Sequence, residues 1–183
     1  MDGLRQRLRP LHPDELDPGQ RQLYDAVVGG PRGRTAHPPV DDQGRLRGPF
    51  AAMLLSPPVG EALQGLGAAL RFGSALTDRA REIATLLVAA HCDSAYEWAA
   101  HSALGRRAGL SDAEIATLRT GSAAFDDATE DVVARATSTL LDSGDLPDAL
   151  YAEADQVLGP AAVFDLVTLV GTRNTASTSA SSR

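Results

Sequence analysis

Apolar residues recur at helical spacing along most of the chain. Leu63, Leu66 and Leu70 follow a spacing of three to four residues, and many later stretches share it. This period is typical of an amphipathic α-helix, whereas a half-buried strand would alternate apolar and polar residues. Helices are expected over 18–28, 51–55, 59–72 and 78–90, from Ser94 to Gly109, from Ser111, over 128–142, from Pro147 and after Pro160.

The breaks between these stretches divide the chain. Residues 31–48 are rich in proline and arginine without periodicity, and a loop of that length is often functional, for example as a cover over a pocket. The last residues are almost entirely Ser, Thr and Ala. We therefore expect an N-terminal extension over 1–17, one helical domain over 18–174 and a disordered tail over 175–183.

Composition supports an all-α fold. Aromatic residues make up 4% of the chain, and alanine and leucine dominate the periodic stretches. These two residues favour helices, whereas strands are usually rich in β-branched and aromatic residues.

The charged and sulfur-bearing residues exclude several classes of protein. The chain has 17 basic and 24 acidic residues, a formal net charge of −7, and every basic residue is an arginine. This balance argues against nucleic acid or an anionic membrane surface as a partner. The lack of lysine excludes a Schiff-base lysine. Cys92 is the single cysteine, which excludes an intrachain disulfide, a four-cysteine metal cluster and a dithiol redox cycle.

The hydropathy pattern shows no transmembrane segment. The chain has no run of about 18 apolar residues, and no apolar segment follows its first residues as a secretory signal would require. We therefore expect a cytoplasmic protein.

Residues 82–101 concentrate the side chains that could do chemistry. On a helix with about 100° per residue, Ser94 and His101 lie within roughly 20° of each other, and Glu97 lies about 40° from His101. These three residues are expected to share one helix face. Cys92 would project away from that face, but Ser94 and Glu97 have the pattern of a capping box, which would start the helix at Ser94.

Glu97 and His101 have a spacing suited to proton transfer. A carboxylate four residues before a histidine can bind one ring nitrogen and leave the other as a general acid or base. Glu82 would be a third titratable group if its apolar helix buries it. The spacing also has structural explanations, because Glu97 could serve the capping box or form a solvated helix contact.

A metal site is a weaker alternative for the same segment. His91, Glu97 and His101 could supply ligands, but the segment has no HxxxH motif or second pair of ligands. We therefore predict no metal site.

Several strings of the chain resemble one protein family. They are Arg81-Glu82, Tyr96-Glu97-Trp98-Ala99-Ala100-His101 and 108–115, with Arg47-Gly48-Pro49-Phe50, Leu70-Arg71-Phe72-Gly73 and Phe125-Asp126-Asp127 around them. They are similar to the carboxymuconolactone decarboxylase-like family, in its branch with a YEW-type motif. The resemblance implies an alkylhydroperoxidase D-like all-α fold of antiparallel helix pairs, without a cofactor and in a homo-oligomer, a trimer or hexamer.

The resemblance also implies roles for individual residues. Peroxidase members of this fold use a glutamate, two cysteines and a histidine, and their spacing here selects Glu82, Ser94, Glu97 and His101. Both thiol positions therefore hold oxygen-bearing side chains. The resemblance then favours a lyase or isomerase that decarboxylates or isomerises a small lactone-like organic acid by acid–base chemistry. Glu97 would orient His101, His101 would move the proton, and Glu82 would tune or relay it.

Four further residues are assigned to substrate binding. Tyr96 and Ser94 would line the pocket, and Arg47 and Arg71 would bind a substrate carboxylate, because a guanidinium can hold a carboxylate through two hydrogen bonds.

Two other functions remain open. Cys92 could be a lone peroxidatic thiol recycled by an external thiol, which would give a peroxiredoxin-type antioxidant activity. The chain could also be a non-catalytic oligomeric protein that binds a small acid.

Overall fold

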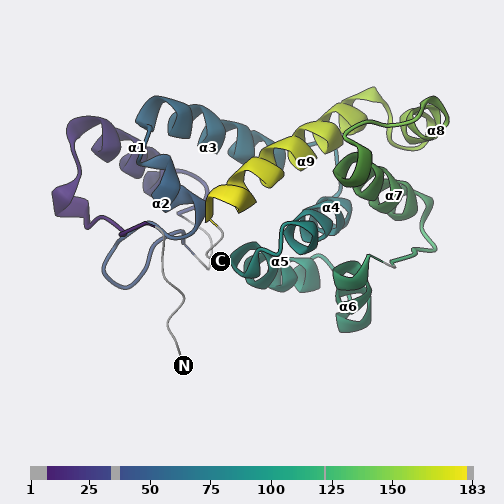
Figure 1. Cartoon of the computed structure of the whole chain (residues 1–183), viewed down its shortest axis with the longest axis horizontal. Coiled ribbons are helices and arrows are strands. Elements are labelled where there is room, and N and C mark those ends of the chain that lie inside the picture. Colours follow the sequence, from purple (N-terminus) through teal and green to yellow (C-terminus); the bar gives the residue numbers. More distant parts are fainter. Residues whose placement is uncertain (1–7, 34–37, 122, 181–183) are drawn as a thin grey trace. The chain divides into compact units, whose positions relative to one another are not determined.

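The structure is a computed structural model that describes residues 8–33, 38–121 and 123–180 (Figure 1). Its regular structure in these ranges is helical, apart from one isolated bridge between Val40 and Leu46. The prediction of an all-α chain is confirmed. After a 3-10 turn at Pro13–Glu15 the helices are α1 (Pro18–Gly29), α2 (Pro49–Met53), α3 (Pro57–Phe72), α4 (Asp78–His91), α5 (Ala95–Arg107), α6 (Asp112–Thr120), α7 (Ala128–Ser143), α8 (Asp148–Leu158) and α9 (Pro160–Ala180).

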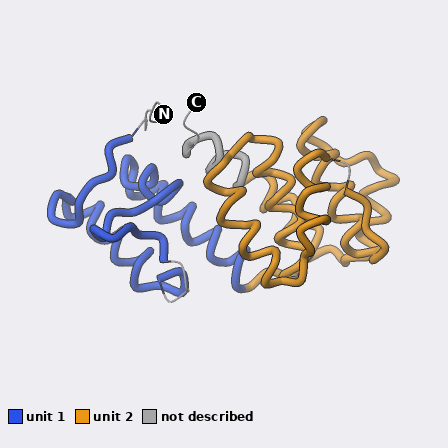
Figure 2. The backbone as a smooth tube through the Cα atoms, turned by 90° about the horizontal axis from the view of Figure 1, so that it is seen from below, with its two compact units in different colours: residues 1–72, 179–183 blue, residues 73–178 orange. Residues whose placement is uncertain are grey.

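The chain separates into two compact units, which are coloured in Figure 2. Unit 1 comprises residues 1–72 and 179–183, and unit 2 comprises residues 73–178. We expected a single helical domain over 18–174. The division after Phe72 arises because α3 packs against α1 and α2, whereas α4 packs against the helices that follow it.

Unit 1 has its own small core. Leu23 and Val27 of α1, with Leu46 and Leu54, form a buried cluster, and Leu11 and Leu16 pack against it. Part of the expected N-terminal extension therefore belongs to this unit. Gly60 allows α3 to approach α2 closely, because a Cβ atom there would lie 2.6 Å from the carbonyl oxygen of Met53.

The second half of the long 31–48 segment has a defined turn. The amide of Asp41 donates to the carbonyl of Arg45 and that of Arg47 donates to the carbonyl of Pro39, each at 2.9 Å. The Asp41 carboxylate also accepts hydrogen bonds from the backbone and the guanidinium of Arg45. Residues 34–37, which include Arg34 and His37, lie outside the described residues.

Helix α4 is the centre of unit 2, as its apolar sequence predicts. Every residue from Ala80 to Ala89 is buried, and α5, α6 and α7 all pack against this helix. A second cluster joins α7, α8 and α9 through Val132, Ala154 and Val163. Because α4 is buried on all sides, a charged side chain in this helix is surrounded by protein and not by water.

Helix α9 continues through Ala180, so its backbone includes residues 175–180 of the segment predicted to be a tail. Adding a residue to an existing helix is far easier than starting one, and no proline follows Pro160 to stop it. Residues 181–183 lie outside the described residues. None of the helices described, taken singly, has the length and hydropathy of a membrane span. Helix α8 and residues 160–172 reach that length and hydropathy only as a pair, and the pair is bent by 119°.

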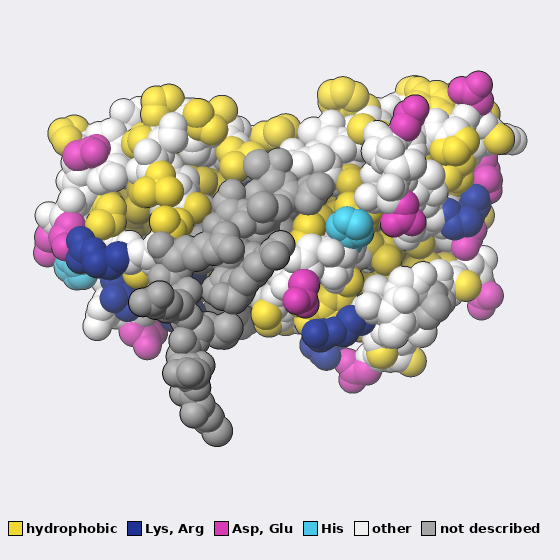
Figure 3. All heavy atoms as spheres, viewed as in Figure 1, with side chains coloured by type: hydrophobic (Ala, Val, Ile, Leu, Met, Phe, Trp, Pro, Cys, Tyr) yellow, Lys and Arg dark blue, Asp and Glu magenta, His cyan; other side chains and the backbone are white. Residues whose placement is uncertain are grey.

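Several large apolar side chains of the helices stay exposed. Leu66 in α3 and Val167 in α9 are each 41% exposed, and Phe164 is 71% exposed. Hydrophobic side chains are correspondingly visible on the surface in Figure 3. Single apolar residues at a surface are common in soluble proteins, so these exposures do not by themselves identify a site.

Candidate active site

The turn between α4 and α5 determines which side chains meet. The amide of Asp93 donates to the carbonyl of Ala90 at 3.1 Å, and the amide of Ser94 donates to the carbonyl of Ala89 at 2.9 Å. This pair of hydrogen bonds defines a Schellman motif, which ends a helix within one turn. Only three residues separate the two helices, so α5 returns along α4 as its antiparallel neighbour.

The start of α5 differs from the predicted capping box. Ser94 is the N-cap residue, but its side chain makes no capping hydrogen bond. The second predicted box is present, because Ser111 and Glu114 cap α6 reciprocally. Ser94 and Glu97 therefore do not form the reciprocal box, and the Glu97 carboxylate lies beside His101, with 3.3 Å between Oε2 and the ring Nε2.

His101 lies between two carboxylates. Its Nδ1 atom is 2.6 Å from Oε2 of Glu82 on α4, and its Nε2 atom faces Glu97 on its own helix. All three residues are only 4% exposed. We call Glu82, Glu97 and His101 the buried triad.

The buried triad holds at least two mobile protons. A neutral imidazole has one N–H donor and one lone pair, and a lone pair that faces a carboxylate is repelled by it. Both ring contacts become attractive only if the imidazole is doubly protonated or if one carboxyl group is protonated. The arrangement can therefore pass a proton between its two carboxyl groups through His101.

A further charge lies next to the triad. Nε of Arg81 is 3.8 Å from Oε1 of Glu82, and the Arg81 side chain is only 10% exposed. Arg81 was not among the site residues predicted from the sequence. A charged residue beside Glu82 in the most apolar helix was the available signal, since charges are rarely buried unless they are paired.

The four predicted substrate ligands belong to two different units of the chain. Ser94 is buried near the start of α5, whereas Tyr96 is 39% exposed on the same helix. Arg47 and Arg71 belong to unit 1, where the Arg71 guanidinium lies 5.5 Å from the ring centre of Phe72. The role of these four residues in binding a substrate stays a prediction.

Cys92 ends α4, where its amide donates to the carbonyl of Val88 at 3.0 Å. Its side chain is partly exposed. The predicted break between Cys92 and the helix of His101 is present, so the thiol and the imidazole lie on different elements.

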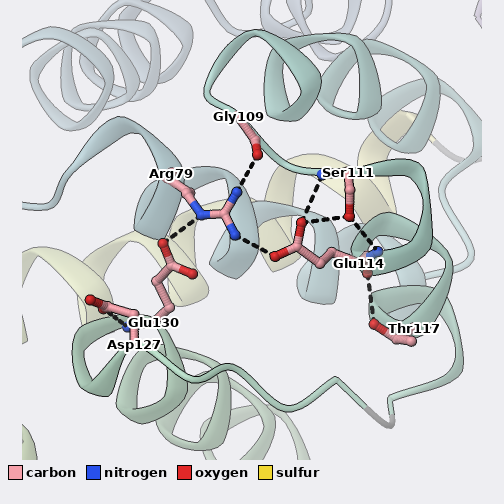
Figure 4. A network of polar contacts seen from close by, with 7 residues as sticks. All are labelled: Arg79, Gly109, Ser111, Glu114, Thr117, Asp127 and Glu130. Carbon is pink, nitrogen blue, oxygen red and sulfur yellow. Dashed lines mark hydrogen bonds and ion pairs between the residues drawn. The ribbon is translucent and has the colours of Figure 1, made fainter.

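A second polar network fixes the helices around α4 (Figure 4). The guanidinium of Arg79 donates to Glu130 of α7, to Glu114 of α6 and to the carbonyl of Gly109. Hydrogen bonds from Ser111 and then the ion pair with Arg79 hold the pKa of Glu114 below its ordinary value. This network is structural, because its groups satisfy one another.

The donor sets do not suggest a metal centre. In the parts of the chain that the structure describes, no three His, Cys, Asp or Glu side chains are placed to hold a metal ion together.

Comparison with known proteins identifies the family of this segment. Residues 57–138 match the model of the carboxymuconolactone decarboxylase family, and no curated protein matches the chain. The fold of that family is the alkylhydroperoxidase D-like all-helical fold, as the resemblance implied. The finer assignment to a YEW-type branch stays a prediction. The segment that contains Glu82, Glu97 and His101 is therefore similar to the carboxymuconolactone decarboxylase family over residues 57–138.

Proposed function

We propose that this protein is a lyase or isomerase that acts on a small lactone-like organic acid by proton transfer, without a cofactor. The observation that carries the proposal is the imidazole of His101 between two buried carboxylates. Buried groups that share protons are suited to acid–base catalysis, because the low-dielectric surroundings make each proton transfer sensitive to its neighbours.

The geometry changes the roles within the buried triad. Both ring nitrogens of His101 face carboxylates, so His101 acts as the internal relay and a carboxyl group meets the substrate. Glu97 is the better candidate for that contact, because it lies in the first turn of α5 next to the exposed Tyr96, whereas Glu82 lies within the buried stretch of α4. Glu82 then stabilises the positive charge on the ring.

A decarboxylation at this site would use one proton. The bond between the substrate carbon and its carboxylate breaks, and the electron pair passes into the conjugated lactone as an enolate. Carbon dioxide leaves, and Glu97 protonates the carbanionic carbon while His101 returns a proton to Glu97. An isomerisation would remove a proton from one carbon and deliver it to another by the same relay.

The test is turnover of carboxymuconolactone and related small lactone acids, followed by carbon dioxide release and by deuterium incorporation in heavy water. We expect His101→Gln to lower kcat/KM by about a hundredfold or more, the usual contribution of a general acid–base group. Cys92→Ser is the matched control and should keep the wild-type rate. An unchanged rate for His101→Gln on a compound that the wild type converts would overturn the proposal.

The partner and assembly predictions also belong to this proposal. We propose that the chain forms a homo-oligomer, a trimer or hexamer, and binds neither nucleic acid nor membranes. Light scattering of the full chain measures the assembly, and a monomer at micromolar concentration would contradict it.

A further inference from the structure

Arg81 lies beside the buried triad without contacting the imidazole. Its Nε atom is 3.8 Å from Oε1 of Glu82, and the other oxygen of Glu82 is the one that binds His101. The guanidinium of Arg81 and the imidazole of His101 therefore contact different oxygens of the Glu82 carboxylate. A change of charge at Arg81 would reach the ring through this shared group.

The charges of these four side chains balance when the buried triad holds two protons. Glu82 and Glu97 supply two negative charges when both are ionised, and Arg81 and a doubly protonated His101 supply two positive charges. Charges inside a protein are stable only when they are compensated, because burial removes their hydration. A guanidinium cannot be deprotonated in a protein, so Arg81 is the fixed member of this balance.

The other contacts of Arg81 leave most of its charge for the triad. Nη2 of Arg81 donates to the Asp78 carboxylate at 2.8 Å, but the Asp78 side chain is 81% exposed. Water screens such a surface pair, so Asp78 compensates the guanidinium only weakly. Glu82 is buried and takes the larger share of the attraction.

Two carboxylates of the helices that pack against α4 are engaged by another guanidinium. The buried residues of α7 are uncharged, and Glu130 of α7 and Glu114 of α6 are both bound to Arg79. The charged groups in contact with Glu82 include Arg81 from α4 and His101 from α5, and Glu97 lies on the other ring nitrogen of His101.

We propose that Arg81 is a positioning residue whose fixed positive charge, acting through Glu82, sets how many protons the buried triad holds. With Arg81 present, Glu82 stays ionised and anchors the imidazole. Without it, the uncompensated carboxylates hold protons more tightly, and the relay releases them only at higher pH. This inference rests on the proposed function, because a relay works only while its protons can move.

The test follows the ring nitrogen signals of His101 by NMR of the full chain with labelled histidines, as a function of pH, and His101→Gln assigns the signals. No substrate is needed, so the result is independent of any failure to find turnover. We expect Arg81→Gln to move the midpoint of the ring titration upward by about one pH unit, since a lost positive charge favours protonation.

Two variants separate charge from structure. Arg81→Lys keeps the charge and should move the midpoint by less than half as much, and Asp78→Asn removes only the surface partner and should leave it in place. If Arg81→Gln does not fold, Arg81→Met replaces it, because methionine fills a similar volume without a polar group. The same upward move of the midpoint is expected for Arg81→Met. The proposal would be overturned if the titration midpoint of Arg81→Gln or Arg81→Met equalled that of the wild type. It would also be overturned if Arg81→Lys moved the midpoint as far as the uncharged variants do.

Discussion

The imidazole Nδ1 atom of His101 lies 2.6 Å from the Glu82 carboxylate, although the two residues are 19 positions apart in the chain. The contact exists because α5 returns along α4 after a turn of three residues. With Glu97 on the opposite nitrogen, it makes His101 a connection between two carboxyl groups rather than a group with a nitrogen left for the substrate.

Glu97 should be essential for turnover if it is the group that meets the substrate. Glu97→Gln keeps the shape of the side chain but cannot release a proton, so kcat/KM should fall by about a hundredfold to ten-thousandfold. Glu97→Asp keeps the carboxyl group one methylene short and should recover part of the rate. Steady-state kinetics and urea unfolding of both variants measure this.

One result would assign the roles differently. If Glu97→Gln keeps the wild-type rate while His101→Gln loses it, then His101 acts on the substrate directly and the carboxylate of Glu97 only supports the ring.

The network around Arg79 should make stability depend on pH in a defined window. The pKa of Glu114 is lowered from its ordinary value of 4.5, first by the Ser111 hydroxyl and backbone and then by Arg79. A carboxyl group with a lowered pKa in the folded state stabilises that state fully above pH 4.5, and this contribution is lost as the pH falls through the folded-state value.

Glu114→Gln should therefore cost about 1 kcal/mol of unfolding free energy near neutral pH, and the difference from wild type should shrink below pH 4.5. Urea unfolding across that pH range measures it. Asp112→Asn is the control, because its carboxylate is 81% exposed in its pair with Arg106 and its loss should change the unfolding free energy by less than that of Glu114. A constant difference at all pH values would mean that the Glu114 side chain acts by packing and not by charge.

The sequence predicted those features of the site that arise from residues within a single helix. The period of apolar residues indicated α4, and the spacing of Glu97 and His101 placed both on one face of α5. Ser111 and Glu114 formed the predicted capping box, because both halves of that motif lie within four residues.

The features that the sequence did not predict depend on contacts between distant residues. The sequence pattern predicted that Glu97 would complete a capping box with Ser94, whereas its carboxylate contacts His101 one helical turn later. The contact between His101 and Glu82 needs the turn at Asp93, which has no glycine to indicate it. The division after Phe72 likewise follows from which helices pack together, and no local motif encodes that choice.

Asp93 should be a position where glycine stabilises the protein. Its φ of 48° lies in the left-handed region, where Gly109 and Gly121 serve the next two helix ends. Asp93→Gly removes the steric cost of a Cβ atom there, so the unfolding free energy should rise by about 0.5–1 kcal/mol.

The matched variant is Gly109→Ala after α5, which places a Cβ atom at φ 96° and should lower stability by about 1 kcal/mol or more. Urea midpoints measure both changes. A lower midpoint for Asp93→Gly would mean that the aspartate side chain stabilises the turn by more than its conformation costs.

Two buried threonines should respond oppositely to the same substitution. The hydroxyl of Thr85 in α4 donates to the carbonyl of Arg81 at 2.8 Å, whereas the hydroxyl oxygen of Thr137 in α7 has no hydrogen-bond partner among the described residues. Both side chains are at most 1% exposed. Valine has nearly the same shape, so Thr→Val tests the hydroxyl group at almost constant packing.

Removing a hydrogen-bonded hydroxyl loses that bond, and Thr85→Val should lower the unfolding free energy by about 1 kcal/mol. Removing a buried hydroxyl without a partner eliminates a desolvation cost, so Thr137→Val should raise it by about 0.5–1 kcal/mol. Urea unfolding at neutral pH measures both values. A loss of stability in Thr137→Val equal to that in Thr85→Val would show that an internal water molecule binds the Thr137 hydroxyl, because only a satisfied hydroxyl costs stability when it is replaced by a methyl group.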